Sequence, residues 1–355
     1  MTDLGALNRD FQKYDQVRKE HTYRLAESGA DSFDEDYEIA TLDFARYLTG
    51  DADERAGFAK EFAAALREIG FAVLTGHGVD PLLYDEIHDG VLDLFTTTPM
   101  KDKMRFRAAR HGSVAQGYFP LEETSDIHPD LVEGWVWCRR AFDIPQERDG
   151  SFCAQDYWPR AEHERLFRRL VLAHEPLFKP IAQAMFQGLG VDPHVYDEKL
   201  TQTNFGLRLN YYPLMTNDQD SSGAGRLFGH EDVDLFTILP ASRVDGLQVW
   251  NHQTGKWVRM RAPYGSIIIN TGDYIQRITN DVLPSTTHRV GKPTDRSHLK
   301  LPRVSFPMAV YVWENEVLEV LPGLGEPKYP PVKAISFHTR STSKFYGDDY
   351  AVESE

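Results

Sequence analysis

The sequence predicts a mainly β protein with flanking helices, built around a double-stranded β-helix (jelly roll). Between residues 201 and 315, about eight short segments rich in apolar, aromatic and β-branched residues are separated by turn signals such as Gln253-Thr254-Gly255. A strand number near eight is typical of a jelly roll of two facing sheets. Between residues 38 and 200, apolar residues instead recur at helical spacing, which predicts the flanking helices.

The stretch 38–200 is expected to begin with two strands that enclose a helix. Residues 39–43 and 71–74 are short apolar runs and predict strands. Residues 53–69 carry apolar side chains at helical spacing, and Gly70 should end that helix.

Two further helices are expected in the same stretch. One should follow Asp80, with this residue as its cap and Pro81 at its first position. A longer one should span 161–189, where Pro176 and Pro180 should kink or interrupt it because proline lacks the backbone N–H.

The expected organisation is a single structural unit with four parts. These are a polar leader (1–37), a helical amino-terminal part packed on the barrel (38–200), a jelly-roll catalytic core (201–315) and a carboxy-terminal tail (316–355). In the core, strands are expected at 204–212, 235–239, 247–251, 256–260, 266–270, 274–278, 288–290 and 303–312.

The two ends of the chain are expected to lie outside the barrel. The leader contains a possible helix at 7–25 and an acidic linker at 31–36. In the tail, residues 337–346 combine aromatic and basic side chains, and their position after the barrel suggests a lid over its mouth.

Composition excludes several classes of partner. The chain has 355 residues, 41% of them hydrophobic, and a net charge of −15. Such an acidic protein is not expected to bind nucleic acid or an anionic membrane surface. No apolar run approaches membrane-spanning length, and the start at Met1 shows no signal peptide. Cys138 and Cys153 are expected to be reduced thiols of a cytoplasmic protein, whose oligomeric state stays open.

His230 and Asp232 are the first candidate metal ligands. They stand two apart, beside the apolar run 235–239, so they would project to the same side of a strand. His288 follows 56 residues after Asp232 and can complete the set. Two imidazoles and a carboxylate on one face of iron(II) leave three positions open, as in non-haem iron oxygenases.

Other histidines are less suited to that role. His128-Pro129-Asp130 has the same spacing but lies in a polar, proline-containing loop that cannot hold two ligands side by side. His174 lies on an expected helix and is interpreted as a packing or surface residue.

Two pairs of polar residues on expected strands could face the barrel interior. Asn210 and Tyr212 present an amide and a phenol on one face, and Arg303 and Ser305 present a guanidinium and a hydroxyl. A buried guanidinium needs an anionic partner, either a carboxylate of the protein itself or that of a cosubstrate.

In their order and spacing these motifs resemble the isopenicillin-N-synthase-like branch of the iron(II)/2-oxoglutarate-dependent dioxygenases. The resemblance covers roughly residues 38–315. It is carried by motifs of both halves: the runs 63–79 and 117–119, His230-Glu231-Asp232, the run 269–276, Thr279-Asn280, Ser285, His288-Arg289-Val290 and Arg303-Val304-Ser305.

The resemblance implies a distorted jelly roll with Fe(II) at one mouth. It implies that His230, Asp232 and His288 bind the iron and that Arg303 and Ser305 hold the distal carboxylate of 2-oxoglutarate. Asn210 and Tyr212 resemble residues of the same pocket. Dioxygen and 2-oxoglutarate would be consumed, with release of succinate and CO2, while an unactivated C–H bond of a small molecule is oxidised.

Two alternatives remain open. The chain could be an iron oxidase of the same fold that does not consume 2-oxoglutarate, or a non-enzymatic jelly-roll binder. The substrate is not specified by the sequence, although Arg105, Arg107 or Arg110 could anchor a carboxylate if they are not simply solvated. Leu235 and Phe236 either shape selectivity or only pack the core.

Overall fold

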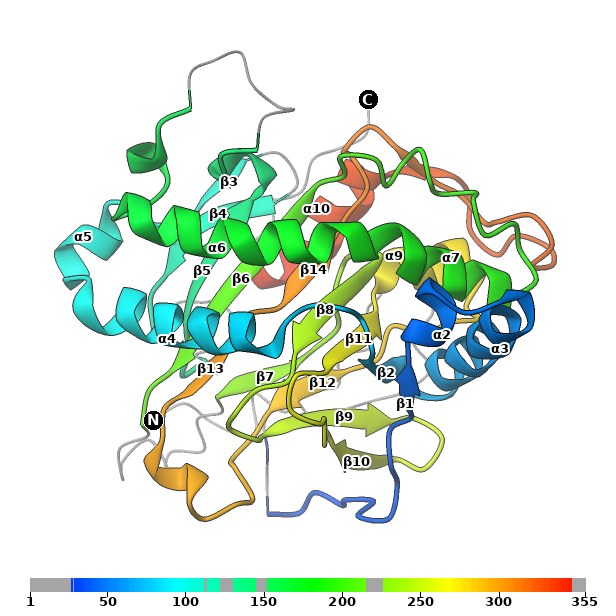
Figure 1. Cartoon of the computed structure of the whole chain (residues 1–355), viewed down its shortest axis with the longest axis horizontal. Helices are drawn as coiled ribbons and strands as arrows, with labels where there is room; N and C mark the ends of the chain where they lie inside the picture. Colours follow the sequence, from blue (N-terminus) through cyan, green and yellow to red (C-terminus); the bar gives the residue numbers. More distant parts are fainter. Residues whose placement is uncertain are drawn as a thin grey trace.

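Two β-sheets form the centre of the protein, as the computed structural model shows for residues 27, 29–111, 114–121, 130–144, 152–214 and 226–346 (Figure 1). The long sheet consists, in spatial order, of β1 (Thr41–Asp43), β2 (Phe71–Thr75), β11 (Ile267–Thr271), β8 (Phe236–Pro240), β14 (Met308–Val310), β6 (Phe205–Tyr212), β5 (Glu133–Cys138), β4 (Val114–Phe119) and β3 (Ala109–His111), and β13 (Arg303–Ser305) also pairs with β6. The short sheet has the order β10 (Lys256–Arg259), β9 (Leu247–Asn251), β12 (His288–Val290) and β7 (Leu227–His230).

Helices cover the long sheet. In Figure 1, α4 (Pro81–Thr97) and α6 (Ala161–His174) run alongside each other across it, and α3 (Ala52–Ile69) packs against α7 (Phe178–Gly188) at one end. Shorter helices are α2 (Ala45–Leu48), α5 (Met100–Met104) and α9 (Asp273–Ile278), and α10 (Ala334–Tyr346) follows the ribbon of β15 (Val317–Leu318) and β16 (Val332–Lys333). No helix in the described part is both long and apolar enough to cross a bilayer.

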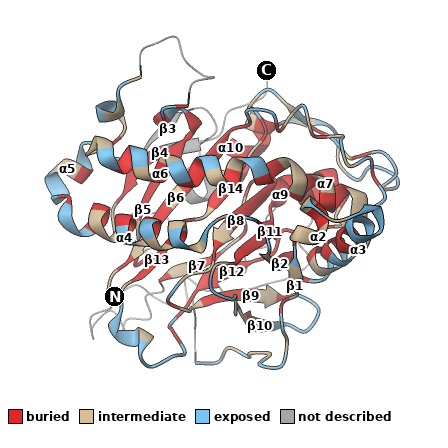
Figure 2. Ribbon diagram, in the orientation of Figure 1, coloured by how far each residue is buried: buried red, intermediate tan, exposed pale blue. Residues whose placement is uncertain are grey.

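Burial follows this layering. The strands of both sheets are mostly buried, whereas the helices expose their outer faces (Figure 2). Within the core, Trp135, Trp137 and Trp158 stack on one another, with centroid separations of 5.1 and 3.8 Å along the series. Such stacking adds packing energy to the burial of large apolar surfaces.

The helix boundaries confirm the predicted stop at Gly70 and the predicted cap at Asp80. The Asp51 carboxylate accepts hydrogen bonds from the backbone of Asp53 and Glu54 at the start of α3, and Gly70 ends the helix with a φ of 72°. Glycine adopts such a left-handed conformation more readily than any other residue because it has no β-carbon. Asp80 likewise caps α4 by accepting from the Leu82 N–H at 3.0 Å.

The long helix expected over 161–189 is interrupted as predicted at Pro176. A single 3₁₀ turn, Glu175–Leu177, separates α6 from α7. Pro180 lies in the first turn of α7, where its missing N–H would have had no helical partner.

Two strand predictions were wrong. Residues 274–278 form most of the buried helix α9, whose Tyr274 N–H donates to the Asp234 carbonyl. A short apolar run does not distinguish a buried helix from a buried strand, because both faces are covered in either case. The expected strand 303–312 is two strands, β13 and β14, and the gap between them contains Pro307.

The amino-terminal part contributes more strands than expected. Besides β1 and β2, the strands β3, β4 and β5 extend the long sheet next to β6. Their pairing depends on contacts with residues that are distant in sequence. The possible leader helix at 7–25 lies outside the described residues.

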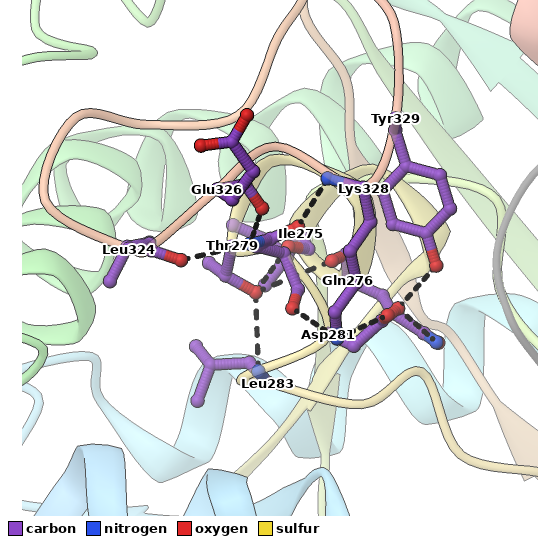
Figure 3. Close-up of polar contacts among 10 residues, drawn as sticks. Ile275, Gln276, Thr279, Asp281, Leu283, Leu324, Glu326, Lys328 and Tyr329 are labelled. Carbon is purple, nitrogen blue, oxygen red and sulfur yellow. Dashed lines mark hydrogen bonds and ion pairs between the residues drawn. The ribbon is translucent and has the colours of Figure 1, made fainter.

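A turn after α9 connects the site region to the carboxy-terminal segment (Figure 3). Asn280 and Asp281 both have left-handed backbones, with φ values of 58° and 66°. The Asn280 amide donates to the carbonyls of Leu324 and Glu326, while Asp281 accepts from the Tyr329 hydroxyl at 2.6 Å. These bonds hold the tail against the turn that leads to β12.

Candidate metal centre

Three side chains from two parts of the chain converge at one end of the short sheet. His230 is the last residue of β7, and the adjacent strand β12 begins with His288, its register partner. The Asp232 carboxylate oxygen Oδ1 lies 3.8 Å from Nε2 of each histidine. One potential ligand atom from each of the three lies within 4.8 Å of the others, which is compact enough for a single metal ion.

The expected position of Asp232 on a strand was wrong in one respect. β7 ends at His230, and Asp232 lies in the connection to β8. The two side chains still face each other, because backbone contacts hold this connection. The Asp232 carbonyl accepts from the Asp273 N–H at 2.8 Å, at the start of α9.

Both imidazole rings are oriented by backbone carbonyls. Nδ1 of His230 donates to the Phe228 carbonyl at 2.9 Å, and Nδ1 of His288 donates to the Thr286 carbonyl at 3.1 Å. A carbonyl can only accept, so the hydrogen must lie on Nδ1 and the lone pair on Nε2. This is the tautomer that binds a metal through Nε2.

The Asp232 carboxylate is held through its second oxygen. Oδ2 accepts from the Thr237 hydroxyl at 2.7 Å and from the Asn270 amide at 2.8 Å, which leaves Oδ1 toward the histidines. The motif prediction had assigned no role to Thr237 or Asn270. Their role follows from their position on β8 and β11, which are neighbours in the sheet. The pairing of these two strands cannot be predicted from the sequence alone.

The protonation states of His230 and Asp232 favour the binding of a cation. Burial, followed by the charge of His288, lowers the pKa of His230 to about 4, so the ring is neutral near pH 7. Burial acts to raise the pKa of Asp232, but the two histidines and the bonds from Thr237 and Asn270 outweigh it and hold that pKa below its ordinary value.

The carboxyl group of Asp234 lies next to that of Asp232, on the other side of the Thr237 hydroxyl. Burial and then the charge of Asp232 raise the pKa of Asp234 well above its ordinary value. Thr237 lies 2.7 Å from a carboxylate oxygen of both residues but has a single hydroxyl hydrogen. A protonated Asp234 that donates to Thr237 lets this hydroxyl donate in turn to Asp232.

The four residues expected to hold a cosubstrate also lie together. Arg303 and Ser305 on β13 are the register partners of Tyr212 and Asn210 on β6. The Asn210 amide lies 3.4 Å from the Ser305 hydroxyl, and the guanidinium carbon of Arg303 lies 5.0 Å from the Tyr212 ring centre.

Arg303 is a buried cation without a counter-ion in the described structure. The residue is 2% exposed, and Nε and Nη1 of its side chain have no hydrogen-bond partner among the described residues. Burial lowers its pKa. An unpaired buried guanidinium is unfavourable, so this pocket fits an anionic ligand such as a carboxylate.

Of the remaining candidates, those with described side chains do not join the centre. Arg105 and Arg107 are exposed on the α5 side, and the side chain of Arg110 lies outside the description, as do His128 and Pro129. His174 is fully buried and lies 3.1 Å from the Tyr84 hydroxyl, so it has the expected packing role.

Three other expectations concern residues around the site. Leu235 and Phe236 are both buried in the main core cluster. Cys138 and Cys153 are free thiols. In α10, Nδ1 of His338 lies 3.1 Å from the Tyr274 hydroxyl, so this helix packs against α9, and its role as a lid stays a prediction.

Comparison with protein families gives two matches along the chain. Residues 203–310 match the family model of the 2OG-Fe(II) oxygenase superfamily. Residues 39–161 match that of the N-terminal region of non-haem dioxygenases in morphine synthesis.

Individual proteins agree with these matches. The 2-oxoglutarate-Fe(II) type oxidoreductase ppzD of Metarhizium rileyi is 26% identical over 88% of this chain and 92% of its own. Gibberellin 20 oxidase 1 of Oryza sativa is 27% identical over 72% of this chain and 67% of its own.

Solved structures confirm the predicted jelly-roll fold. A full-length Neurospora crassa protein, crystallised with alpha-KG and thymine, superimposes with a TM-score of 0.75 at 21% identity, over 90% of this chain and 100% of that one. A 2OG-Fe(II) oxygenase family protein from Caulobacter crescentus gives 0.72 at 25% identity, over 86% and 98%.

Proposed function

The chain belongs to the 2OG-Fe(II) oxygenase superfamily, and we propose that His230, Asp232 and His288 bind its iron. It is an iron(II)- and 2-oxoglutarate-dependent oxygenase that oxidises a C–H bond of a small molecule. When bound, the iron and 2-oxoglutarate supply the oxidising chemistry, in which dioxygen is consumed and succinate and CO2 are released.

The convergence of the three ligand atoms is the observation that carries this assignment. Nε2 of both histidines and Oδ1 of Asp232 point to one place, and each side chain is fixed by a hydrogen bond on its far side. Ligands held in this way need little reorganisation when the metal binds. Three protein ligands leave positions for the cosubstrate and dioxygen.

Arg303, Ser305, Tyr212 and Asn210 are proposed to hold the distal carboxylate of 2-oxoglutarate. The unpaired N–H groups of Arg303 support this, since a carboxylate would satisfy them and neutralise the buried charge. Ser305 adds a hydroxyl donor from the same strand. These residues bind and orient the cosubstrate, and the buried strands around them exclude water.

Anaerobic titration tests the assignment directly. Addition of 2-oxoglutarate to the iron(II) protein should produce a weak metal-to-ligand charge-transfer band, and Asp232→Ala should lose it because the metal site is incomplete. An iron oxidase that does not use 2-oxoglutarate would give no band. A non-enzymatic binder would release no succinate under air.

We propose that the substrate is a small organic molecule and that the protein acts in the cytoplasm. The similar Neurospora crassa protein was crystallised with thymine, which supports a small organic molecule as the substrate. Two free thiols support the cytoplasm as the site of action. We also propose that residues 38–315 act as one unit, because strands from both halves share the long sheet.

A further inference from the structure

A buried carboxylate contacts the strand that ends in His230. Asp130 lies three residues before β5 and is 2% exposed, and its Oδ1 accepts from the Phe228 N–H on β7 at 2.9 Å. β7 is the last strand of the short sheet and, among the described residues, pairs with a strand on one side only. Asp130, which the sequence pattern offered only as part of a false metal motif, therefore supplies an acceptor to this strand.

The contact falls where β7 is irregular. Leu227 pairs with Val290 and His230 pairs with His288, so two residues of β7 lie opposite a single residue of β12. Phe228 is one of the two. Such a bulge redirects the side chains next to it, and its backbone groups need partners outside the regular ladder.

The backbone of Phe228 links Asp130 to the metal centre. Its N–H donates to Asp130, and its carbonyl accepts from Nδ1 of His230 at 2.9 Å. Both groups belong to one residue, so fixing the N–H restricts the rotation that would turn the carbonyl away from the ring. The direction of this carbonyl determines how His230 presents Nε2 to a metal.

Apolar packing fixes the segment that carries Asp130. The next two residues, Leu131 and Val132, are buried, and Val132 clusters with side chains of β6, β7 and β12, namely Tyr212, Leu227 and Val290. The carboxylate is therefore held in place against the bulge. A buried carboxyl group is costly without hydrogen bonds, and an apolar residue at this position would leave the Phe228 N–H without this acceptor.

We propose that Asp130 is a positioning residue for His230: it holds the bulge of β7 so that the Phe228 carbonyl orients the imidazole for metal binding. This inference rests on the proposed function, because it concerns a ligand of the proposed iron. Asp130 does not itself touch the metal, and its effect passes through one backbone residue.

Proton NMR of the cobalt(II)-loaded protein tests the effect on His230 separately from that on His288. Cobalt(II) shifts the Nδ1–H signals of bound imidazoles out of the protein envelope, and the His288 signal can be recognised by its proximity to the Phe71 ring, whose centre lies 5.4 Å from that of the imidazole. In Asp130→Ala the His230 Nδ1–H signal should move and exchange faster with water, while the His288 signal stays in place.

Iron(II) affinity provides the second measurement, by anaerobic competition with a chelator. Asp130→Ala should bind iron roughly 10- to 100-fold more weakly than the wild type, and Asp130→Asn should recover most of the affinity because its amide oxygen can still accept. Burial raises the pKa of Asp130 to about 7, against the opposing effects of the Phe228 N–H and the charge of Arg208, so measurements at pH 8 keep the wild-type carboxyl group mainly ionised.

Glu164→Ala is the matched control. Glu164 is a buried carboxylate that accepts from the Asp143 N–H at 2.7 Å, but it lies on α6 in the helical layer. This variant should lose stability in the metal-free form and keep the wild-type iron affinity. If Asp130→Ala does not fold, Asp130→Leu fills a similar volume without an acceptor and takes its place.

Wild-type iron affinity in Asp130→Ala or Asp130→Leu would overturn the proposal. So would equal losses of affinity in the Glu164 control, or the same change in both imidazole signals, since either result would show a general loss of structure. A wild-type protein without the two shifted signals would instead contradict the assignment of the metal ligands.

Discussion

At the scale of single residues, the site depends on hydrogen bonds that hold one end of a side chain. These bonds determine which atom at the other end is left available to a ligand. The motif positions His230, Asp232, His288 and Arg303 could be selected from the sequence because their residue types and spacing match a known chemistry. Supporting residues such as Thr237 could not, because a threonine on a strand has no distinctive pattern. Its role appears only once β8 and β11 are paired.

Arg303→Ala should raise the 2-oxoglutarate requirement strongly while iron binding stays largely intact. Loss of a charged partner of a buried carboxylate costs on the order of 2 to 5 kcal/mol. The half-saturating 2-oxoglutarate concentration in the charge-transfer titration measures the change. Unchanged affinity for the cosubstrate would show that the pocket is assigned wrongly.

Asn270→Ala should weaken iron binding by roughly 10- to 100-fold, because the Asp232 carboxylate loses one of the two bonds that orient it. Equilibrium competition with a chelator of known affinity provides the measurement. Asn251→Ala is a control, since this buried asparagine on β9 bonds only to its own turn among the described residues. Equal losses in both variants would mean that Asn270 has no specific role.

At the scale of helices and strands, sequence patterns predicted the elements whose ends carry local signals. α3 and α4 follow their caps, and the proline at position 176 divides α6 from α7. The pattern misassigned α9, which is buried throughout, and missed β5, which is buried apart from Glu133, because elements covered on both faces lose the periodicity that distinguishes helix from strand. Their identity is decided by the strands and helices around them.

His174 on α6 should make the protein less stable in acid. Burial, followed by the charge of His77, lowers its pKa from 6.5 to about 3. As the pH falls below 6.5, the unfolded chain takes up a proton that the folded one refuses, so stability declines by up to about 1.4 kcal/mol per pH unit until about pH 3.

His174→Gln should remove this component, since glutamine does not titrate and can still accept from the Tyr84 hydroxyl. Urea unfolding of metal-free wild type and variant at pH 7.5 and pH 5 measures it. The wild type should lose more stability than the variant between the two values, and parallel losses would contradict the assignment to His174.

A chain that ends at Lys333 should lose most of its substrate-coupled succinate formation. The deletion removes α10, including Phe337, which is fully buried, and His338 beside Tyr274. His338→Phe is the milder companion variant, which keeps the helix but changes its contact with Tyr274. Full coupled turnover in the truncated chain would exclude a covering role for α10.

At the scale of the whole molecule, ligand binding and folding are coupled because the site joins both sheets. Iron(II) and 2-oxoglutarate should each raise the midpoint of thermal unfolding under anaerobic conditions. A ligand at 100 times its dissociation constant adds about 2.7 kcal/mol. Arg303→Ala should keep the shift with iron but lose the additional shift with 2-oxoglutarate, and an equal additional shift in both proteins would contradict the coupling.

Because the site is built from both sheets, it also sets the length of the cosubstrate that can be held. Both histidines come from the short sheet and Arg303 from the long one, so a cosubstrate held as we propose would span the space between them. The width of that space should therefore select a 2-oxo diacid by the length of its carbon chain. Oxaloacetate, one methylene shorter, and 2-oxoadipate, one longer, should each fail to satisfy both ends and should support little turnover.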